Sequence, residues 1–401
     1  MAAQEYQAPE SVGRLQQRAL FVGGIALVVS ILGAMRTPEL FYQSYLMSFL
    51  LILGLTVGSL GLLMLQHLTS GHWGIIIRRS LESATRTLPL MAIAFLPIAL
   101  FGMRYLYSGH GNEKGWLNAP STGEGALSDF QRGYLTQNGF YIRAVIYFAV
   151  WLLLMFIFNI LSKQQDARPE DRALRLRFKM LAGPGIILYV FVMSFAAIDW
   201  AMSLSPHWAS TIYGFLFVAG QLISSMSFMI AVVVLLARSE PFASVLQKRH
   251  LHDLGKLLLA FVMLWAYFDF SQLLIIWSGN QPEEISFYRT RLYGGWGVVA
   301  VIVLVFHFFV PFFLLLSQDV KRNAKVLPKI AIWLIFMRLV DLFWMTRPEF
   351  TSRAMPTWLD IVLPIAFGGL WLGLFTFNLR QLPLLPLGDP ELAEAIEHHE
   401  H

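Results

Sequence analysis

The sequence predicts an all-α integral membrane protein of about ten transmembrane helices, and three observations lead to this prediction. Of the 401 residues, 56% are hydrophobic and only 14% are charged, whereas soluble domains average about 25% charged residues. Apolar runs recur along the whole chain, and about 20 such residues cross a bilayer core of about 30 Å. Turn-forming clusters such as Arg36-Thr37-Pro38 and Gly279-Asn280-Gln281-Pro282 separate the runs.

Hydropathy and the turn signals together define the individual helices. They are expected at residues 18–35, 44–67, 85–106, 140–163, 181–204, 211–237, 254–279, 291–316, 326–346 and 357–379. Arg14 and Arg18 precede the first segment, but no small-residue cleavage site follows it. We therefore expect a retained helix and not a signal peptide. The membrane domain then spans residues 18–379, between an N-terminal tail (1–17) and a C-terminal tail (380–401).

The distribution of Lys and Arg predicts the orientation. With ten spans, both termini and the even-to-odd loops share one side, and that side carries KQQDARPEDRALRLRFK and KRNAKVLPK. The opposite loops carry few basic residues. The positive-inside rule therefore places both termini in the cytoplasm of a multi-pass protein. The isoelectric point of about 9.4 follows from this asymmetry and from contact with anionic lipid headgroups, so no nucleic-acid partner is expected.

Two connecting segments differ from the short loops elsewhere. Residues 107–139 form a long Gly-, Ser- and Asn-rich loop on the periplasmic side, punctuated by Trp116, Phe130 and Tyr134. It is either a contact surface for a partner outside the membrane, the interpretation we favour, or a flexible loop. On the cytoplasmic side, HWGIIIRRSLESATR mixes aromatic, apolar and basic residues and is typical of a short interfacial helix.

The composition excludes several kinds of redox centre and catalyst. Because the chain has no cysteine, it can form no disulfide, no thiolate-held iron–sulfur cluster and no covalent c-type haem. Phosphate-loop, dinucleotide-binding and nucleophile-elbow motifs do not occur. A haem held by two histidines is arithmetically open, but only His307 lies well inside a helix, and His67 lies at a helix end. We expect no metal and no cofactor bound by this chain alone.

Polar side chains inside the apolar runs are the candidate functional residues. Asp199 and Asp269 interrupt the fifth and seventh segments, and His307 interrupts the eighth. Arg338 and Asp341 share a face of the ninth and can neutralise each other. Arg104 and Arg143 lie nearer the outer ends of the third and fourth segments. A charge at the membrane centre costs about 2.5–3.5 kcal/mol, so these groups must be paired, neutral or hydrated.

Asp199 and Asp269 have no cation at helical spacing in their own segments, so each needs a partner on another helix or a bound proton. Together with His307, they could form a proton pathway. Tyr213, Gln221 and Ser225 recur at multiples of four residues in the sixth segment. Such a polar stripe either continues a pathway or joins helices by hydrogen bonds. The sequence does not distinguish between two interpretations of these polar groups, a proton relay and a set of interhelical staples.

The stretches QHLTSGHWG and DWAMSLSPHWASTIYG, within a ten-helix layout, resemble the ActF-type membrane subunit of bacterial alternative complex III. That family is related to the NrfD-like membrane subunits of polysulfide and nitrite reductases. The resemblance implies two four-helix bundles, roughly residues 44–204 and 211–346, flanked by peripheral helices. It also implies a location in the bacterial inner (plasma) membrane.

What the resemblance implies about function is a non-redox membrane subunit of a respiratory or photosynthetic quinol:cytochrome c oxidoreductase. Haem c and iron–sulfur clusters would lie on partners, namely a multihaem cytochrome c and an iron–sulfur protein, and a sister NrfD-like subunit would hold the quinol. The present chain would then serve as a scaffold with a transmembrane pathway for proton translocation. The polar residues named above, and His67 with them, are the candidates for that pathway. A groove for menaquinone, another quinone or lipid is compatible with this role.

Two other classes of function are considered beside this one. Ten helices with internal charges suit a secondary transporter, although corresponding Gly/Pro-interrupted segments do not occur in two halves of the chain. A purely structural membrane subunit would use every internal charge as an interhelical staple.

Overall fold

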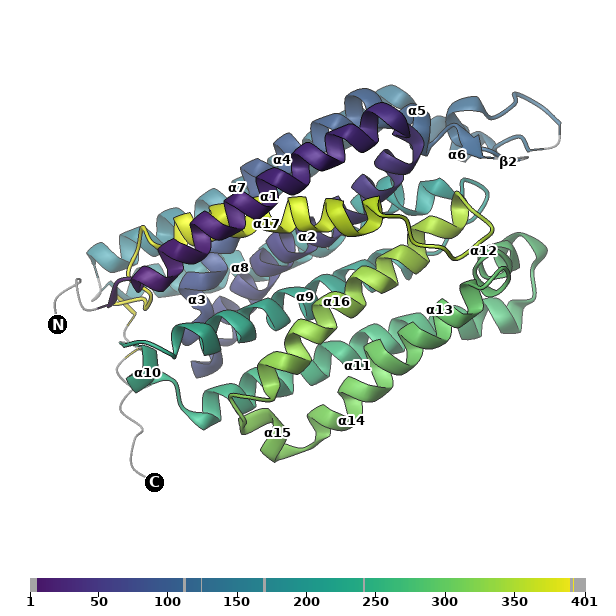
Figure 1. The fold of residues 1–401 in the computed structure, drawn as a ribbon. Coiled ribbons are helices and arrows are strands. Elements are labelled where there is room, and N and C mark those ends of the chain that lie inside the picture. Colours follow the sequence, from purple (N-terminus) through teal and green to yellow (C-terminus); the bar gives the residue numbers. More distant parts are fainter. Residues whose placement is uncertain are drawn as a thin grey trace.

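Long helices lie side by side in the structure, a computed structural model that describes residues 6–110, 113–123, 125–168, 171–240, 242–389 and 392 (Figure 1). The elements of the first half are α1 (Glu10–Arg36), α2 (Pro38–Thr69), α3 (His72–Thr85), α4 (Leu88–Pro97), η2 (Ile98–Gly102), α5 (Met103–Leu106), β1 (Gly109–His110), β2 (Glu113–Lys114), η3 (Trp116–Asn118), α6 (Asp129–Tyr134), α7 (Gln137–Ala167), α8 (Arg172–Trp200) and η4 (Met202–Leu204). Those of the second half are α9 (Tyr213–Leu236), α10 (Phe242–Val245), α11 (Lys248–Gly279), α12 (Pro282–Leu292), α13 (Trp296–Val303), η5 (Leu304–Phe309), α14 (Val310–Leu316), α15 (Gln318–Arg322), α16 (Leu327–Thr346), η6 (Arg347–Glu349) and α17 (Leu359–Leu379).

The predicted fold class is confirmed: the chain is an all-α membrane protein. Within the described residues, nine helical segments are long and apolar enough to cross a bilayer. A tenth long helix, α16, is not among the nine because it carries three charged residues, Lys329, Arg338 and Asp341. The ten segments expected from the sequence correspond to these helices one by one. The only strands in the described part are β1 and β2, which pair over two residues each.

The helices form two bundles with peripheral additions. We call α2, α4, α7 and α8 the first bundle, and α9, α11, α16 and the interrupted helix α13–η5–α14 the second bundle. Helix α9 packs against both α2 and α8, so it joins the two bundles, and α2 also contacts α16. The most apolar stretch of α2 is wholly buried, so the helix needs no separate polar face.

The peripheral pair consists of α1 and α17, which pack closely together beside α2. Small residues permit the close approach: a Cβ at Gly369 would lie 2.6 Å from Gly23 Cα. At the neighbouring Gly368, a Cβ would meet no atom within 4 Å. Backbone approach at small residues is a common way to join helices in lipid, where apolar burial gives little driving force.

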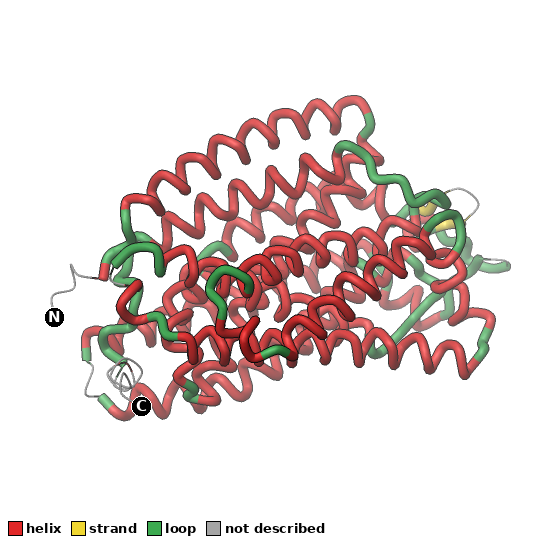
Figure 2. The backbone as a smooth tube through the Cα atoms, turned by 60° about the horizontal axis from the view of Figure 1, so that its bottom comes forward, coloured by secondary structure: helices red, strands yellow, loops and turns green. Residues whose placement is uncertain are grey.

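The bundle has two distinct ends. At the terminal end, α1 begins, α17 ends and α10 and α15 lie; the backbone N–H of Leu384 donates to the Tyr6 carbonyl at 2.7 Å. At the loop end lie α6, α12 and the strand pair. Figure 2 shows the two strands, in yellow, among the loops at this end. The polar segments described below are named by these two ends.

Candidate functional site

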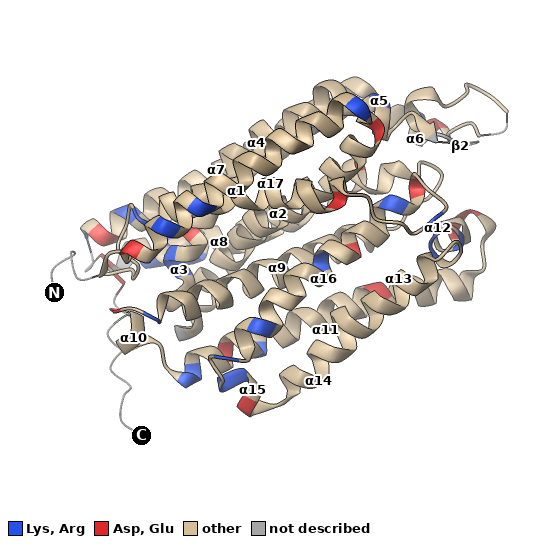
Figure 3. Ribbon diagram, viewed as in Figure 1, with Lys and Arg blue, Asp and Glu red and all other residues tan. Residues whose placement is uncertain are grey.

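Charged residues are unevenly placed along the helices. Figure 3 shows Lys and Arg concentrated at the terminal end, with a smaller number of acidic and basic residues along the helices and at the loop end. The isolated charges between the ends are those that need an explanation, because lipid cannot solvate them.

Asp199 forms an ion pair that joins two helices of the first bundle at the loop end. Arg143 of α7 donates from Nε to Oδ2 at 2.8 Å and from Nη2 to Oδ1 at 2.9 Å, and the Tyr147 hydroxyl donates to Oδ2 at 2.6 Å. The Asp199 side chain is only 1% exposed. Arg143 also lies over the Tyr134 ring, 3.9 Å from its centroid. This bidentate, fully satisfied arrangement is a structural staple between α7 and α8.

Arg338 and Asp341 form the predicted ion pair inside α16, in the second bundle. Both side chains are almost fully buried. Gly220 of α9 makes room for the guanidinium, because a Cβ there would lie 2.2 Å from Arg338 Cζ. The Phe217 ring, 5.4 Å away, adds a cation–π contact. The pair is thus accommodated by specific features of the neighbouring helix.

His307 lies beside this pair and is fully enclosed. Its side chain has no exposed surface, and neither ring nitrogen has a hydrogen-bond partner within the described residues. The Trp265 ring of α11 packs edge-to-face against it, with centroids 4.5 Å apart. His307 belongs to the π-helical segment η5, and such segments often mark functional positions. An unpaired buried polar group costs about 1–3 kcal/mol, so this position is kept at an energetic cost.

Asp269 of α11 is half-buried and has neither a hydrogen bond nor an ion pair with any described residue. Its carboxylate interacts electrostatically with Asp341, and Tyr288 of α12 lies within the same range. Asp269 therefore differs from Asp199: it has no cation partner among the described residues, whereas Asp199 has a bidentate one. A lone carboxylate near a second carboxylate is a chemically suitable proton acceptor.

The polar stripe of α9 divides into two parts. Ser225 donates to the Gly54 and Leu55 carbonyls at 3.1 and 3.0 Å, and Gln221 accepts from the Tyr189 hydroxyl at 3.1 Å. These two residues join α9 to the first bundle. The Tyr213 hydroxyl is buried and has no partner among the described residues, and its ring lies near Arg291 and the Arg338–Asp341 pair. Only Tyr213 thus belongs to the second-bundle cluster.

The segment between α8 and α9 connects the bundles at the loop end. Trp208 stacks on Phe287 of α12 with centroids 3.9 Å apart, and Ser210 donates to Gln272 of α11 at 3.0 Å. A groove of about 420 Å³, mostly apolar, runs between this segment and α6. Burial, and secondly the Asp199 charge, raise the pKa of the Tyr134 hydroxyl beside the groove to about 12, so that group stays protonated.

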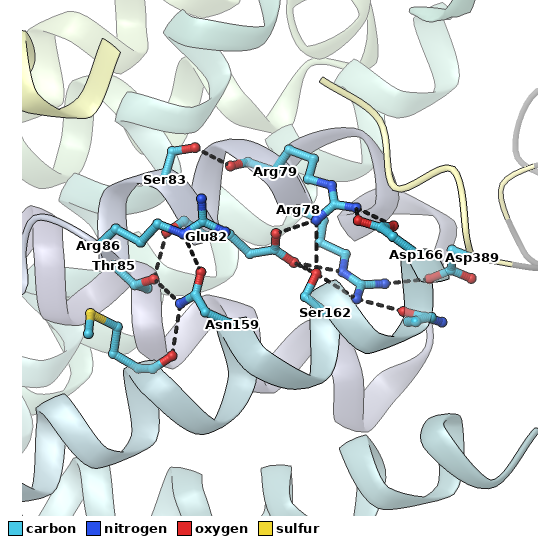
Figure 4. A network of polar contacts seen from close by, with 12 residues as sticks. Arg78, Arg79, Glu82, Ser83, Thr85, Arg86, Asn159, Ser162, Asp166 and Asp389 are labelled. Atoms are coloured by element: carbon cyan, nitrogen blue, oxygen red, sulfur yellow. Dashed lines mark hydrogen bonds and ion pairs between the residues drawn. The ribbon is translucent and has the colours of Figure 1, made fainter. Parts of the chain in front are cut away.

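At the terminal end, α3 carries a buried network of charges (Figure 4). Glu82 accepts from Arg78 at 3.1 Å, from Arg79 at 2.7 Å and from Ser162 at 2.6 Å. Arg78 also donates to Asp389 at 2.6 Å, and Arg79 pairs with Asp166 of α7. Arg86, which donates to Asn159 at 2.6 Å, is the third basic group of the network, so three arginines balance three acids. Arg78 and Arg79 are at most 2% exposed.

This network corrects one sequence-based expectation. The helix predicted at HWGIIIRRSLESATR is present, but Arg78 and Arg79 face protein and do not anchor the helix to lipid headgroups. The reason is that α3 folds back against α2, α9 and α17. His67 is also enclosed here, stacked on Phe178 with centroids 4.0 Å apart, and its Nε2 atom has no partner among the described residues.

The remaining candidates lie outside these clusters. Arg104 is exposed at the loop-end terminus of its helix and lies over the Tyr105 ring. Part of the predicted 107–139 loop lies outside the described residues; in the described part, Trp116 is buried against Tyr107, whereas Phe130 is 82% exposed. The predicted C-terminal tail beyond residue 392 lies outside the described residues.

Several functional neighbours are not evident from the sequence. No partner was assigned to Asp199 from the sequence. Arg143 could have been chosen, because it lies near the same end of the preceding antiparallel helix. Arg347 pairs with Asp360 at 3.0 Å and Arg291 with Glu349 at 2.7 Å, both at the loop end. Trp265, which packs against His307, is not distinguished in the sequence from other tryptophans, so it could not have been predicted as a neighbour of the site.

Comparison with known proteins gives no assignment, since the sequence matches no family model and no curated protein. Among the described residues, no group of three or more His, Cys, Asp or Glu side chains is placed to hold a metal ion.

Proposed function

We propose that this chain is a scaffold subunit of a membrane oxidoreductase whose second bundle contains a proton pathway. The observation that carries the pathway is the combination of His307, which has no hydrogen-bond partner in the described part of the chain, with Asp269 beside the Arg338–Asp341 pair. Each of the first two groups can take up and release a proton, at a ring nitrogen and a carboxyl oxygen respectively. The fixed ion pair supplies the electrostatic setting in which they do so.

Asp199 has a different role in this proposal. Its two oxygens already accept hydrogen bonds from Arg143 and Tyr147, so this carboxylate is engaged in holding α7 to α8. The relay interpretation therefore applies to the second bundle and the staple interpretation to the first. A wholly structural chain is less well supported. A residue that joins helices must bond to a neighbour, and the buried His307 imidazole has no hydrogen-bond partner among the described residues.

The complex to which the chain belongs is proposed from the resemblance of the 66–74 and 199–214 segments. We propose membership in the alternative complex III class of quinol:cytochrome c oxidoreductases, in the bacterial inner membrane with both termini cytoplasmic. Haem c and iron–sulfur clusters would reside on partner subunits.

The loop-end groove is the place where a quinone would fit. Its walls are apolar and suit an isoprenoid tail, and Tyr134 is among the residues that line it. A bound quinone would supply two-electron redox chemistry. The chain itself would position the ring and exclude water.

Affinity purification of the tagged chain from mild detergent tests the proposed complex. The expected product contains additional subunits and shows the absorption bands of haem c. A secondary transporter would instead purify alone and remain folded and active in that form. A chain that purifies alone and catalyses solute exchange in vesicles would overturn the proposal.

A further inference from the structure

A groove at the terminal end separates the α1–α17 pair from the second bundle. It has a volume of about 780 Å³ and runs between α1, α9, α16 and α17. Its walls are apolar and include Phe228, Ala231, Ile332, Leu372 and Phe375. In a chain that spans the bilayer, such walls at helix ends lie at the depth where the lipid chains meet their headgroups.

The rim of this groove is basic. Arg238 follows α9, and Lys325 and Lys329 stand at the start of α16; all three line the groove. Arg14 and Arg18 of α1 line an adjoining pocket, which shares Val12 and Leu15 with the groove. Among the described residues, no Asp or Glu lines either cavity.

These five basic side chains are exposed. The ion pairs found among the described residues involve none of them. Elsewhere at the terminal end, Arg78 and Arg79 are neutralised by acidic groups in the α3 network. The absence of such acids at the groove means that its positive charge is available to an external anion. The N-terminus of α16, a 20-residue helix, adds partial positive charge at the same place.

We propose that this groove binds one anionic phospholipid, with its acyl chains between α16 and α17 and its phosphate on Arg238, Lys325 and Lys329. Basic pockets between transmembrane helices are a recognised mode of binding acidic headgroups. A neutral lipid would leave the basic rim uncompensated, and a soluble anion would leave the apolar walls unfilled. The proposal does not depend on the enzyme complex or on which leaflet the terminal end faces.

Native mass spectrometry of the purified full chain tests the site, with phosphatidylglycerol and phosphatidylcholine as probes. The first variant carries Arg238→Gln, Lys325→Gln and Lys329→Gln. A basic group next to acidic lipid contributes about a fivefold factor in affinity, so the three together should weaken phosphatidylglycerol binding about a hundredfold. The matched control neutralises three exposed lysines elsewhere at the terminal end, Lys163, Lys179 and Lys248. It should change binding by less than about threefold.

A second variant separates the groove from simple surface attraction. Ala231→Trp fills part of the apolar groove without changing any charge, and should weaken binding of phosphatidylglycerol at least about tenfold. Equal binding of the two lipids, an equal loss in the control, or unchanged binding in the Ala231→Trp variant would each overturn the site.

The occupant in the assembled protein is tested by placing a photo-crosslinking residue at Ala324, which also lines the groove. Labelled phospholipid is the expected product. If the crosslink instead joins Ala324 to another protein subunit, the groove is an interface between subunits and the lipid site is refuted.

Discussion

Neutralising Asp199 should destabilise the first bundle without affecting proton transfer directly. The Asp199 carboxylate accepts three hydrogen bonds from Arg143 and Tyr147. Removing one partner of a buried ion pair costs about 3–5 kcal/mol, because the other charge is left unpaired. Arg143 is 19% exposed, so its stranded charge is less completely enclosed than a fully buried one. We therefore expect Asp199→Asn to lower the free energy of unfolding by about 3 kcal/mol, at the low end of that range.

A double-mutant cycle isolates the pair from other effects. Asp199→Asn, Arg143→Gln and the double variant are compared by unfolding the purified protein in mixed micelles with increasing detergent denaturant. Since each single variant strands one charge and the double variant strands none, the coupling energy should be about 2 kcal/mol. Neutral interhelical hydrogen bonds in membrane proteins average about 0.6 kcal/mol, so a value of that size would mean that no charged staple exists.

The exposed Asp253–Lys256 pair, with side chains 41% and 57% exposed, is the matched control for this cycle. Its coupling should not exceed about 1 kcal/mol. If Asp199→Asn unfolds at the same denaturant concentration as the wild type, the staple interpretation is wrong, whatever its effect on activity.

Three further predictions concern other parts of the molecule. Glu82→Gln should lower the free energy of unfolding by about 3 kcal/mol or more, because Arg78 and Arg79 lose their shared acceptor, whereas exposed Glu240→Gln should leave the melting temperature unchanged. Gly369→Leu should detach α1 from α17 and expose α1 to proteolysis, because its Cβ would meet Gly23; Gly368→Leu is the control, and equal protection of both variants would contradict the close packing. Because the chain has no cysteine, single cysteines can report orientation: those near Arg172 and Lys321 should react only from the cytoplasm and those near Gly123 and Glu284 from outside, and a reversed pattern at any of the four refutes the proposed topology.

The helices could be predicted from the sequence because spanning a bilayer imposes a length and a composition on each one. The pairing within α16 was also predictable, since Arg338 and Asp341 are three residues apart on one helix. The α3 network was not, because an alternation of polar and apolar residues shows that a helix has two faces. It does not show whether the polar face meets water, lipid headgroups or protein.

The residues of the candidate site could be predicted from the sequence, but their spatial arrangement and their partners could not. Asp199 and Asp269 are equivalent in the sequence, as acids in apolar runs, and differ only through tertiary neighbours. The helix register brings Arg143 to Asp199 and leaves Asp269 without a cation among the described residues. The π-helical segment that contains His307 likewise depends on packing, in which Trp333 of α16 donates to the Phe306 carbonyl at 3.0 Å.

Proton translocation by the purified complex in sealed vesicles, measured with a pH-sensitive dye for the Asp269→Asn and His307→Phe variants, tests the central claim most directly. Asp269 makes no hydrogen bond or ion pair with a described residue, so Asp269→Asn removes none. His307→Phe removes a polar group that has no partner among the described residues, which should leave stability unchanged or raise it. The account predicts normal assembly in both variants with proton transfer slowed about a hundredfold, the size of a lost acid–base group. Wild-type proton translocation in both assembled variants would contradict the account.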